Sequence, residues 1–253
     1  MQVLTTYARL YVDDLDTALP SLTELTGADP QWREGFGDLE LAGISRFLLV
    51  AGTPEALAPY RDTQGTAVVA DIDEVEHVLK SHGAEIVGGP LDAPNGRGLT
   101  ARHRGGAVIE YVQWHDELRE RVLSAPQEPA PILATYARLY VDGVDVTLPP
   151  LTELTGAEPA LRFDYGDLEL AGLEGFLLVA GTPGALAPFR ETHATAIITD
   201  LAVVQRILRT HGGQVLAGPE EVPTGRNMTV RHAGGAIIEY VEFSSTVRAE
   251  VIG

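Results

Sequence analysis

The chain has 253 residues, of which 45 % are apolar, and carries a formal net charge of −18 at pH 7. A charge this negative argues against a nucleic-acid partner, because phosphate binding needs clustered lysine and arginine. The lack of cysteine excludes disulfides and thiolate chemistry, and no apolar run is long enough to span a membrane. The N-terminus also lacks the pattern of a signal peptide, so we expect a cytoplasmic protein of one or two domains.

The sequence repeats itself at an offset of 129 residues. Residues 7–13 (YARLYVD) return as residues 136–142, and residues 105–112 (GGAVIEYV) return as residues 234–241 (GGAIIEYV). A period this long indicates duplicated domains rather than a solenoid of short repeats. We therefore predict a first domain at 1–114, a linker at 115–131, a second domain at 132–245 and a C-terminal tail at 246–253.

Hydrophobic periodicity predicts the elements of the first copy in chain order. Residues 4–13 alternate as a half-buried strand does, and a short helix follows from Asp16, as its cap, to Thr26, with Gly27 at its end. Strands are expected near 31–36, 38–44 and 46–51, and residues 53–61 connect over the surface. The pattern then restarts with a strand at 64–71, a helix at 73–82 and strands near 85–88, 97–103 and 107–113.

The linker is expected to hold a short charged helix at 115–123 and a proline-rich spacer at 124–132. Each copy thus has the order βαβββ-βαβββ, and the whole chain is an α+β fold of four βαβββ modules. Mixed strands with one helix for every four strands favour curved sheets with helices on the convex face. The concave face is then left to hold a ligand.

This order of elements resembles the vicinal oxygen chelate (VOC) superfamily, which includes glyoxalases, bleomycin-resistance proteins and extradiol dioxygenases. Residues 8–16 resemble the first strand of that fold and its turn into the helix. Residues 71–86 resemble its second helix and the following strand, and residues 106–110 resemble its last strand. The resemblance covers both copies outside the linker and tail, and it implies a tandem form of the VOC domain.

In metal-using VOC members the ligands lie on the first strand of each module and on the last strands. The positions that correspond here are Tyr7, Gln64 and Glu110 in the first copy and Tyr136, His193 and Glu239 in the second. Tyrosine is a poor ligand for divalent ions, because its hydroxyl titrates near 10. We therefore favour no metal, and we name His193 and Glu239 as the ligands if a divalent metal does bind in the second domain. A site that combines residues from both copies is left open.

Strand alternation places the tyrosines and the arginine of the first strand on one face. In the first copy these are Tyr7, Arg9 and Tyr11, which should face the concavity together with Glu110; in the second they are Tyr136, Arg138, Tyr140 and Glu239. A carboxylate in a buried strand needs a partner, so we predict the ion pairs Arg9–Glu110 and Arg138–Glu239. His103 and His232 precede the glycine turns and are expected to pack on those turns.

Three functions are compatible with these residues. The first is a metal-independent small-molecule binder, similar to the drug- or metabolite-sequestering, bleomycin-resistance-like members, whose ligand is aromatic or cationic. Its ligand-binding residues would be Tyr7, Arg9, Tyr11, Gln64, Glu110, Tyr136, Arg138, Tyr140, His193 and Glu239. The second is a metal-dependent glyoxalase-like lyase or isomerase, or a dioxygenase, using the second domain. The third is a protein–protein module. No catalytic residue is predicted, and the chain is expected to be a monomer or homodimer.

Overall fold

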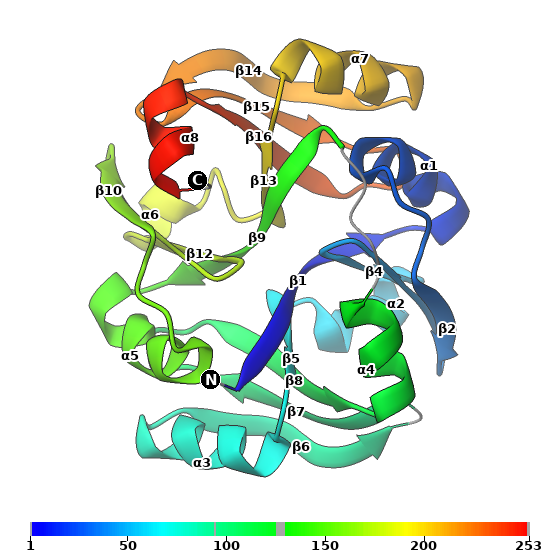
Figure 1. Cartoon of the computed structure of the whole chain (residues 1–253), viewed down its shortest axis with the longest axis vertical. Coiled ribbons are helices and arrows are strands. Elements are labelled where there is room, and N and C mark those ends of the chain that lie inside the picture. The colour runs from blue at the N-terminus through cyan, green and yellow to red at the C-terminus, as the bar shows by residue number, and fades with distance from the viewer. Residues whose placement is uncertain (1, 94, 125–129, 252–253) are drawn as a thin grey trace. The chain divides into compact units, whose positions relative to one another are not determined.

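The computed structural model describes residues 2–93, 95–124 and 130–251, which form an α+β fold of four successive βαβββ modules (Figure 1). The first copy contains β1 Val3–Val12, α1 Leu15–Thr26, β2 Trp32–Phe36, β3 Leu39–Ile44, β4 Phe47–Ala51, α2 Pro54–Leu57, the 3-10 helix η1 Ala58–Tyr60, β5 Gly65–Val69, α3 Ile72–Ser81, β6 Glu85–Ala93, β7 Gly96–Arg102, β8 Val108–Trp114 and α4 Asp116–Leu123. The second copy contains β9 Ile132–Val141, α5 Val144–Thr155, β10 Leu161–Tyr165, β11 Leu168–Leu173, β12 Phe176–Ala180, α6 Pro183–Leu186, β13 Ala194–Ile198, α7 Leu201–Thr210, β14 Gln214–Val222, β15 Gly225–Arg231, β16 Ile237–Phe243 and α8 Ser245–Val251. The predicted βαβββ-βαβββ order is confirmed in both copies.

The strands form two mixed sheets of the same topology. Their orders are β2-β3-β4-β1-β5-β8-β7-β6 and β10-β11-β12-β9-β13-β16-β15-β14. Within each module the first strand runs parallel to the last one, as β1 does to β4 with Ala8 opposite Phe47, and β5 to β8 with Thr66 opposite Glu110. The other neighbouring strands within a module are antiparallel, as in β3–β4 and β7–β8.

Contacts divide the chain into two compact units that cut across the sequence repeat. Unit 1 comprises Met1–Tyr7, Asp62–Ala125 and Ala137–Arg190, and unit 2 comprises Ala8–Arg61, Pro126–Tyr136 and Glu191–Gly253. Each unit therefore joins one module of the first copy to one module of the second, and β1 and β9 each begin in one unit and end in the other. The predicted domain boundaries follow the duplication instead, and as boundaries of independent domains they stay a prediction.

Local signals explain where the helices begin and end. The Asp14 side chain accepts the Thr17 N–H over 2.7 Å, so Asp14 caps α1 and the prediction that Asp16 is the cap was wrong. The helix ends at Gly27, whose φ of 64° favours glycine. The apolar face of α1 buries Leu22 and Leu25, which contributes several kcal/mol by removing apolar surface from water.

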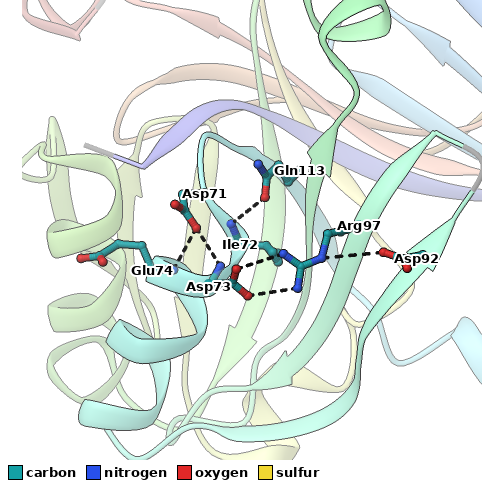
Figure 2. Close-up of polar contacts among 7 residues, drawn as sticks. All are labelled: Asp71, Ile72, Asp73, Glu74, Asp92, Arg97 and Gln113. Carbon is teal, nitrogen blue, oxygen red and sulfur yellow. Dashed lines mark hydrogen bonds and ion pairs between the residues drawn. The ribbon is translucent and has the colours of Figure 1, made fainter.

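The second module of the first copy shows the same logic at α3 (Figure 2). Asp71 caps the helix by accepting the N–H groups of Asp73 and Glu74 over 2.9 and 3.2 Å. Arg97 on β7 holds Asp73 with two hydrogen bonds of 3.0 Å, and this guanidinium lowers the pKa of the Asp73 carboxyl. The helix is therefore tied to the sheet strand that it covers.

The connections differ in part from the sequence-based prediction. The stretch 53–61, expected as a surface connection, contains α2 and η1 and buries Leu57. The charged linker helix is confirmed as α4, whereas most of the proline-rich spacer lies outside the described residues. The predicted tail contains α8.

Candidate functional site

The two units divide the predicted site residues between them and mix the two copies. Unit 1 contains Tyr7, Gln64 and Glu110 of the first copy together with Arg138 and Tyr140 of the second. Unit 2 contains the converse set, Arg9, Tyr11, Tyr136, His193 and Glu239. Arg9 and Glu110 thus belong to different units, as do Arg138 and Glu239, and the two predicted ion pairs stay predictions.

Tyr11 is the centre of a polar and aromatic cluster in unit 2. Its ring lies 6.0 Å from the ring of His193, at an interplanar angle of 56°. The guanidinium carbons of Arg9 and Arg61 lie 5.7 and 5.9 Å from the centre of the Tyr11 ring, within the range of cation–π attraction. Tyr11 and Arg9 are only 7 % and 5 % exposed, so this arginine lies on a buried face of the sheet.

Unit 1 repeats the arginine and tyrosine part of this cluster. Arg138 and Arg190 each lie 5.9 Å from the centre of the Tyr140 ring, and the Tyr140 hydroxyl donates to the Phe189 carbonyl as the Tyr11 hydroxyl does to Tyr60. Tyr7, in the middle of β1, packs against Trp114 with ring centres 5.8 Å apart. The tyrosines of one strand therefore have different neighbours.

His193 is held by the backbone of β16. Its backbone N–H donates to the Ile237 carbonyl over 2.9 Å, and its ring Nδ1 accepts the Ile237 N–H over 3.3 Å. Burial lowers the pKa of His193 to about 4, and the positive charge of Arg61 acts in the same direction. His193 is consequently neutral at pH 7, and with Nδ1 as an acceptor its proton lies on Nε2.

Each strand glutamate accepts a hydrogen bond from a threonine on the neighbouring parallel strand. Thr195 Oγ1 donates to Glu239 Oε2 over 2.9 Å, and Thr66 Oγ1 donates to Glu110 Oε2 over 3.0 Å. Glu239 also accepts a hydrogen bond from Asn227, whose Nδ2 lies 2.9 Å from its Oε1. Glycine occupies the corresponding position of the first copy, Gly98.

The side chains of the glycine-turn histidines point into the core. His232 Nε2 lies 2.7 Å from the Tyr240 hydroxyl and its Nδ1 lies 2.9 Å from Ser21 Oγ. His103 Nε2 lies 2.8 Å from the Tyr111 hydroxyl. Burial lowers the pKa of both histidines to about 4 and raises the pKa of both tyrosines. The backbone of each histidine does hydrogen-bond within its own turn, as His103 N–H does to the Ala107 carbonyl, whereas the side chain contacts a core tyrosine that the sequence did not predict.

Sequence reasoning missed several residues of these clusters. Arg61, Arg190, Thr66, Thr195 and Asn227 contact the predicted site residues but were not predicted. The repeat carried a usable signal, because Arg61 recurs as Arg190 and Thr66 as Thr195 at the 129-residue offset. Asn227 has no such signal.

The donor set does not match the divalent metal that the fold implies. Among the described residues no three histidine or acidic side chains are grouped as a metal site would require. In unit 2, Nδ1 of His193 accepts a backbone N–H, which leaves the proton on Nε2, whereas a histidine ligand presents a bare nitrogen to the metal. Both oxygens of Glu239 accept hydrogen bonds from side chains. The hydrogen bonds on Glu239 are compatible with ligation, since ligating carboxylates are commonly hydrogen-bonded, but His193 in this tautomer does not fit a metal centre.

An open hollow of about 360 Å³ in unit 1 contains none of the predicted site residues. Its lining includes Asp142, Asp164, Asp167 and Glu169. It belongs to the acidic surface of the protein rather than to the tyrosine clusters.

No family model and no curated protein matches this sequence. Solved structures do match its fold. A mutant of 4-hydroxymandelate synthase from Streptomyces coelicolor aligns with a TM-score of 0.59 at 14 % identity, covering 100 % of this chain and 97 % of that one. This chain shares the fold of that synthase, as the resemblance to the VOC superfamily predicted.

Two further solved structures align over almost the whole chain. The 2,3-dioxygenase LapB from Pseudomonas sp. KL28 has a TM-score of 0.59 at 13 % identity and covers 95 % of this chain and 92 % of that one. The Mn(II)-bound glyoxalase from Novosphingobium aromaticivorans has a TM-score of 0.57 at 14 % identity and covers 96 % of this chain and 85 % of that one. At these identities the VOC fold is shared, and the match assigns no activity.

None of the helices in the described ranges has the length and apolar character needed to cross a membrane.

Proposed function

We propose that this VOC-fold protein binds a small polar or aromatic molecule without a metal, as drug- or metabolite-sequestering, bleomycin-resistance-like members do. The observation that carries the proposal is the cluster in unit 2, where Tyr11 and Arg9 of the first copy meet His193 of the second. Aromatic faces stack flat ligands, and a few fixed polar groups orient them. No catalytic residue is assigned, and the cytoplasmic location stays a prediction.

The second unit supplies independent support. Arg138, Arg190 and Tyr140 repeat the arrangement although the duplicated sequences have diverged elsewhere. A buried arginine is costly to maintain as a mere core residue, because its guanidinium must be desolvated. Because both arginines lie beside tyrosine rings at equivalent positions of the repeat, the same polar and aromatic arrangement is present twice.

Isothermal titration calorimetry of the full chain against a library of aromatic and cationic metabolites tests the proposal. Replacing both rings, Tyr11→Leu with Tyr140→Leu, should weaken any aromatic ligand by roughly tenfold or more, since stacking contributes about 1–2 kcal/mol. The matched pair Tyr11→Phe with Tyr140→Phe keeps the rings and should retain most of the affinity. A library without a single ligand would contradict the proposal.

The alternative is a metal-dependent lyase, isomerase or dioxygenase that uses His193 and Glu239, and it requires His193 to give up its hydrogen bond to the Ile237 N–H so that a bare ring nitrogen faces the metal. A divalent metal bound there would polarise a substrate oxygen. Elemental analysis of the purified chain, followed by titration with iron, zinc, nickel or manganese, separates the two functions. Near-stoichiometric metal, lost in His193→Ala, would favour the enzyme.

The third function, a protein–protein module, predicts that Arg9→Ala and Arg138→Ala destabilise the fold without changing affinity for any small molecule.

A further inference from the structure

An exposed arginine lies over the first-strand tyrosine in each unit. Arg61 directly follows η1 and lies 5.9 Å from the centre of the Tyr11 ring, and Arg190 lies at the same distance from Tyr140. Neither arginine belongs to the site that the sequence predicted. Both are solvent-exposed, whereas the tyrosines beneath them are buried.

The position of Arg61 is fixed by the tyrosine that it covers. The Tyr11 hydroxyl donates to the carbonyl of Tyr60, the residue immediately before Arg61. The segment that leads to it is anchored by Thr53, which caps α2, and by the buried side chain of Leu57. The hydrogen bond to the Tyr60 carbonyl therefore holds the backbone next to Arg61 over the Tyr11 ring. The hydrogen bond from the Tyr140 hydroxyl to the Phe189 carbonyl holds Arg190 in the same way.

The charge of this arginine is not neutralised within the protein. Among the described residues, neither Arg61 nor Arg190 has an acidic side chain within ion-pair distance, whereas Arg33 and Arg162 each contact two carboxylates. The acidic residue nearest in sequence to His193, Glu191, lies 3.9 Å from Arg231. Other exposed arginines of the described residues, Arg206 among them, also have no ion pair, but Arg61 and Arg190 differ from Arg206 because each is held over a buried tyrosine ring.

We propose that Arg61 and the Tyr11 ring form a subsite for a planar organic anion, with Arg190 and Tyr140 as a second copy. The exposed guanidinium fork binds a carboxylate or phosphate from the solvent side, and the buried tyrosine ring supports the guanidinium from beneath through cation–π attraction. In unit 2 the Nε2–H of His193 donates a further hydrogen bond to the anion. This inference rests on the proposed small-molecule binding and narrows it. The expectation of a cationic ligand came from the net charge, whereas the local charge at Tyr11 selects an anion.

Titration of the full chain with benzoate, benzamide and benzylammonium at one ionic strength tests the inference. We expect benzoate to bind more tightly than benzamide, and benzylammonium to bind most weakly. Arg61→Gln combined with Arg190→Gln should weaken benzoate by roughly tenfold and leave benzamide unchanged, as loss of a charge-assisted hydrogen bond does. Titration with phenyl phosphate then compares the two anionic groups. If phenyl phosphate binds more tightly than benzoate, the subsite prefers phosphate; if benzoate binds more tightly, it prefers carboxylate.

Arg206→Gln is the matched control, because Arg206 is an exposed arginine of α7 in the same unit with no aromatic ring beneath it in the described residues. It should leave all affinities unchanged, and the thermal unfolding temperature of every variant verifies folding. Binding of benzamide or benzylammonium with no preference for benzoate would overturn the anion subsite but keep the proposed function. Equal benzoate affinity in the Arg61→Gln/Arg190→Gln variant and in Arg206→Gln would also overturn the anion subsite. No binding of any probe, and none in the metabolite library, would overturn both.

Discussion

The two units contain the same buried histidine–tyrosine pair, but only unit 2 completes it. In unit 2, His232 contacts both Tyr240 and Ser21, so each ring nitrogen has a partner. In unit 1, His103 contacts Tyr111, and its Nδ1 is a buried atom without a hydrogen-bond partner in the part of the chain that is described. The reason is visible in the repeat, since α5 has Pro150 where α1 has Ser21.

A similar difference separates the two strand glutamates. Glu239 accepts from Thr195 and Asn227, whereas Gly98 stands at the position that corresponds to Asn227 beside Glu110. In both comparisons unit 2 has a polar side chain, Ser21 or Asn227, at a position where unit 1 has proline or glycine. The duplication therefore preserved the backbone of both units, while these two polar contacts occur in unit 2.

The largest expected effect is loss of stability in acid, and it tests whether the histidines of both units are neutral. The pKa values of His103, His193 and His232 are lowered to about 4 by burial. Because these pKa values lie below the ordinary histidine value of about 6.5, the unfolded chain binds more protons than the folded chain between about pH 4 and pH 6.5. Stability is thus fully present above about pH 6.5 and is lost as the pH falls toward about 4, on the order of 3 kcal/mol for each histidine.

Thermal unfolding between pH 7 and pH 4 measures this loss. His103→Gln and His232→Gln remove one titrating group each and keep a hydrogen-bonding side chain beside the tyrosine. Each variant should flatten the dependence of the unfolding temperature on pH. An unchanged dependence in both variants would show that these histidines are not held neutral.

An intermediate effect is expected from exchanging the serine and the proline. Ser21→Ala leaves Nδ1 of His232 without its partner and should lower the free energy of unfolding by about 1–2 kcal/mol. Pro150→Ser should stabilise unit 1 by supplying a hydroxyl near His103. Pro150→Ala is the control, because it restores the backbone N–H that proline lacks without adding a hydroxyl. Denaturant unfolding measures both changes. Equal stability of Pro150→Ser and Pro150→Ala would show that the hydroxyl does not reach the histidine.

The smallest effect is expected at the glutamates. Asn227→Ala removes one donor from the half-buried Glu239 and should cost about 1 kcal/mol. Gly98→Asn should have the opposite effect at Glu110, because a Cβ there meets only Tyr111 O at 3.6 Å and Val112 Cγ2 at 3.9 Å. Gly98→Ala is the control for the backbone. If Gly98→Asn is no more stable than Gly98→Ala, the introduced amide does not stabilise Glu110.

The sequence by itself determined the fold, because the evidence for it is local and repeated. Alternating strands, the capped helices and the final glycine turns occur at one offset, so the four modules can be counted from the residues alone. The sequence also placed Tyr11, Arg9, His193 and Glu239 at the positions where the clusters occur.

Only the tertiary structure decided which residues meet. Tyr11 contacts His193, and Ser21 contacts His232, although 182 and 211 residues separate them along the chain. Periodicity reports the face of a strand on which a side chain lies, but it carries no information about which module packs against which. Contacts that join the first module to the fourth, and the second to the third, depend on how the modules pack. For the same reason Arg61, which sits on a connection of no regular pattern, was found only from its place over the Tyr11 ring.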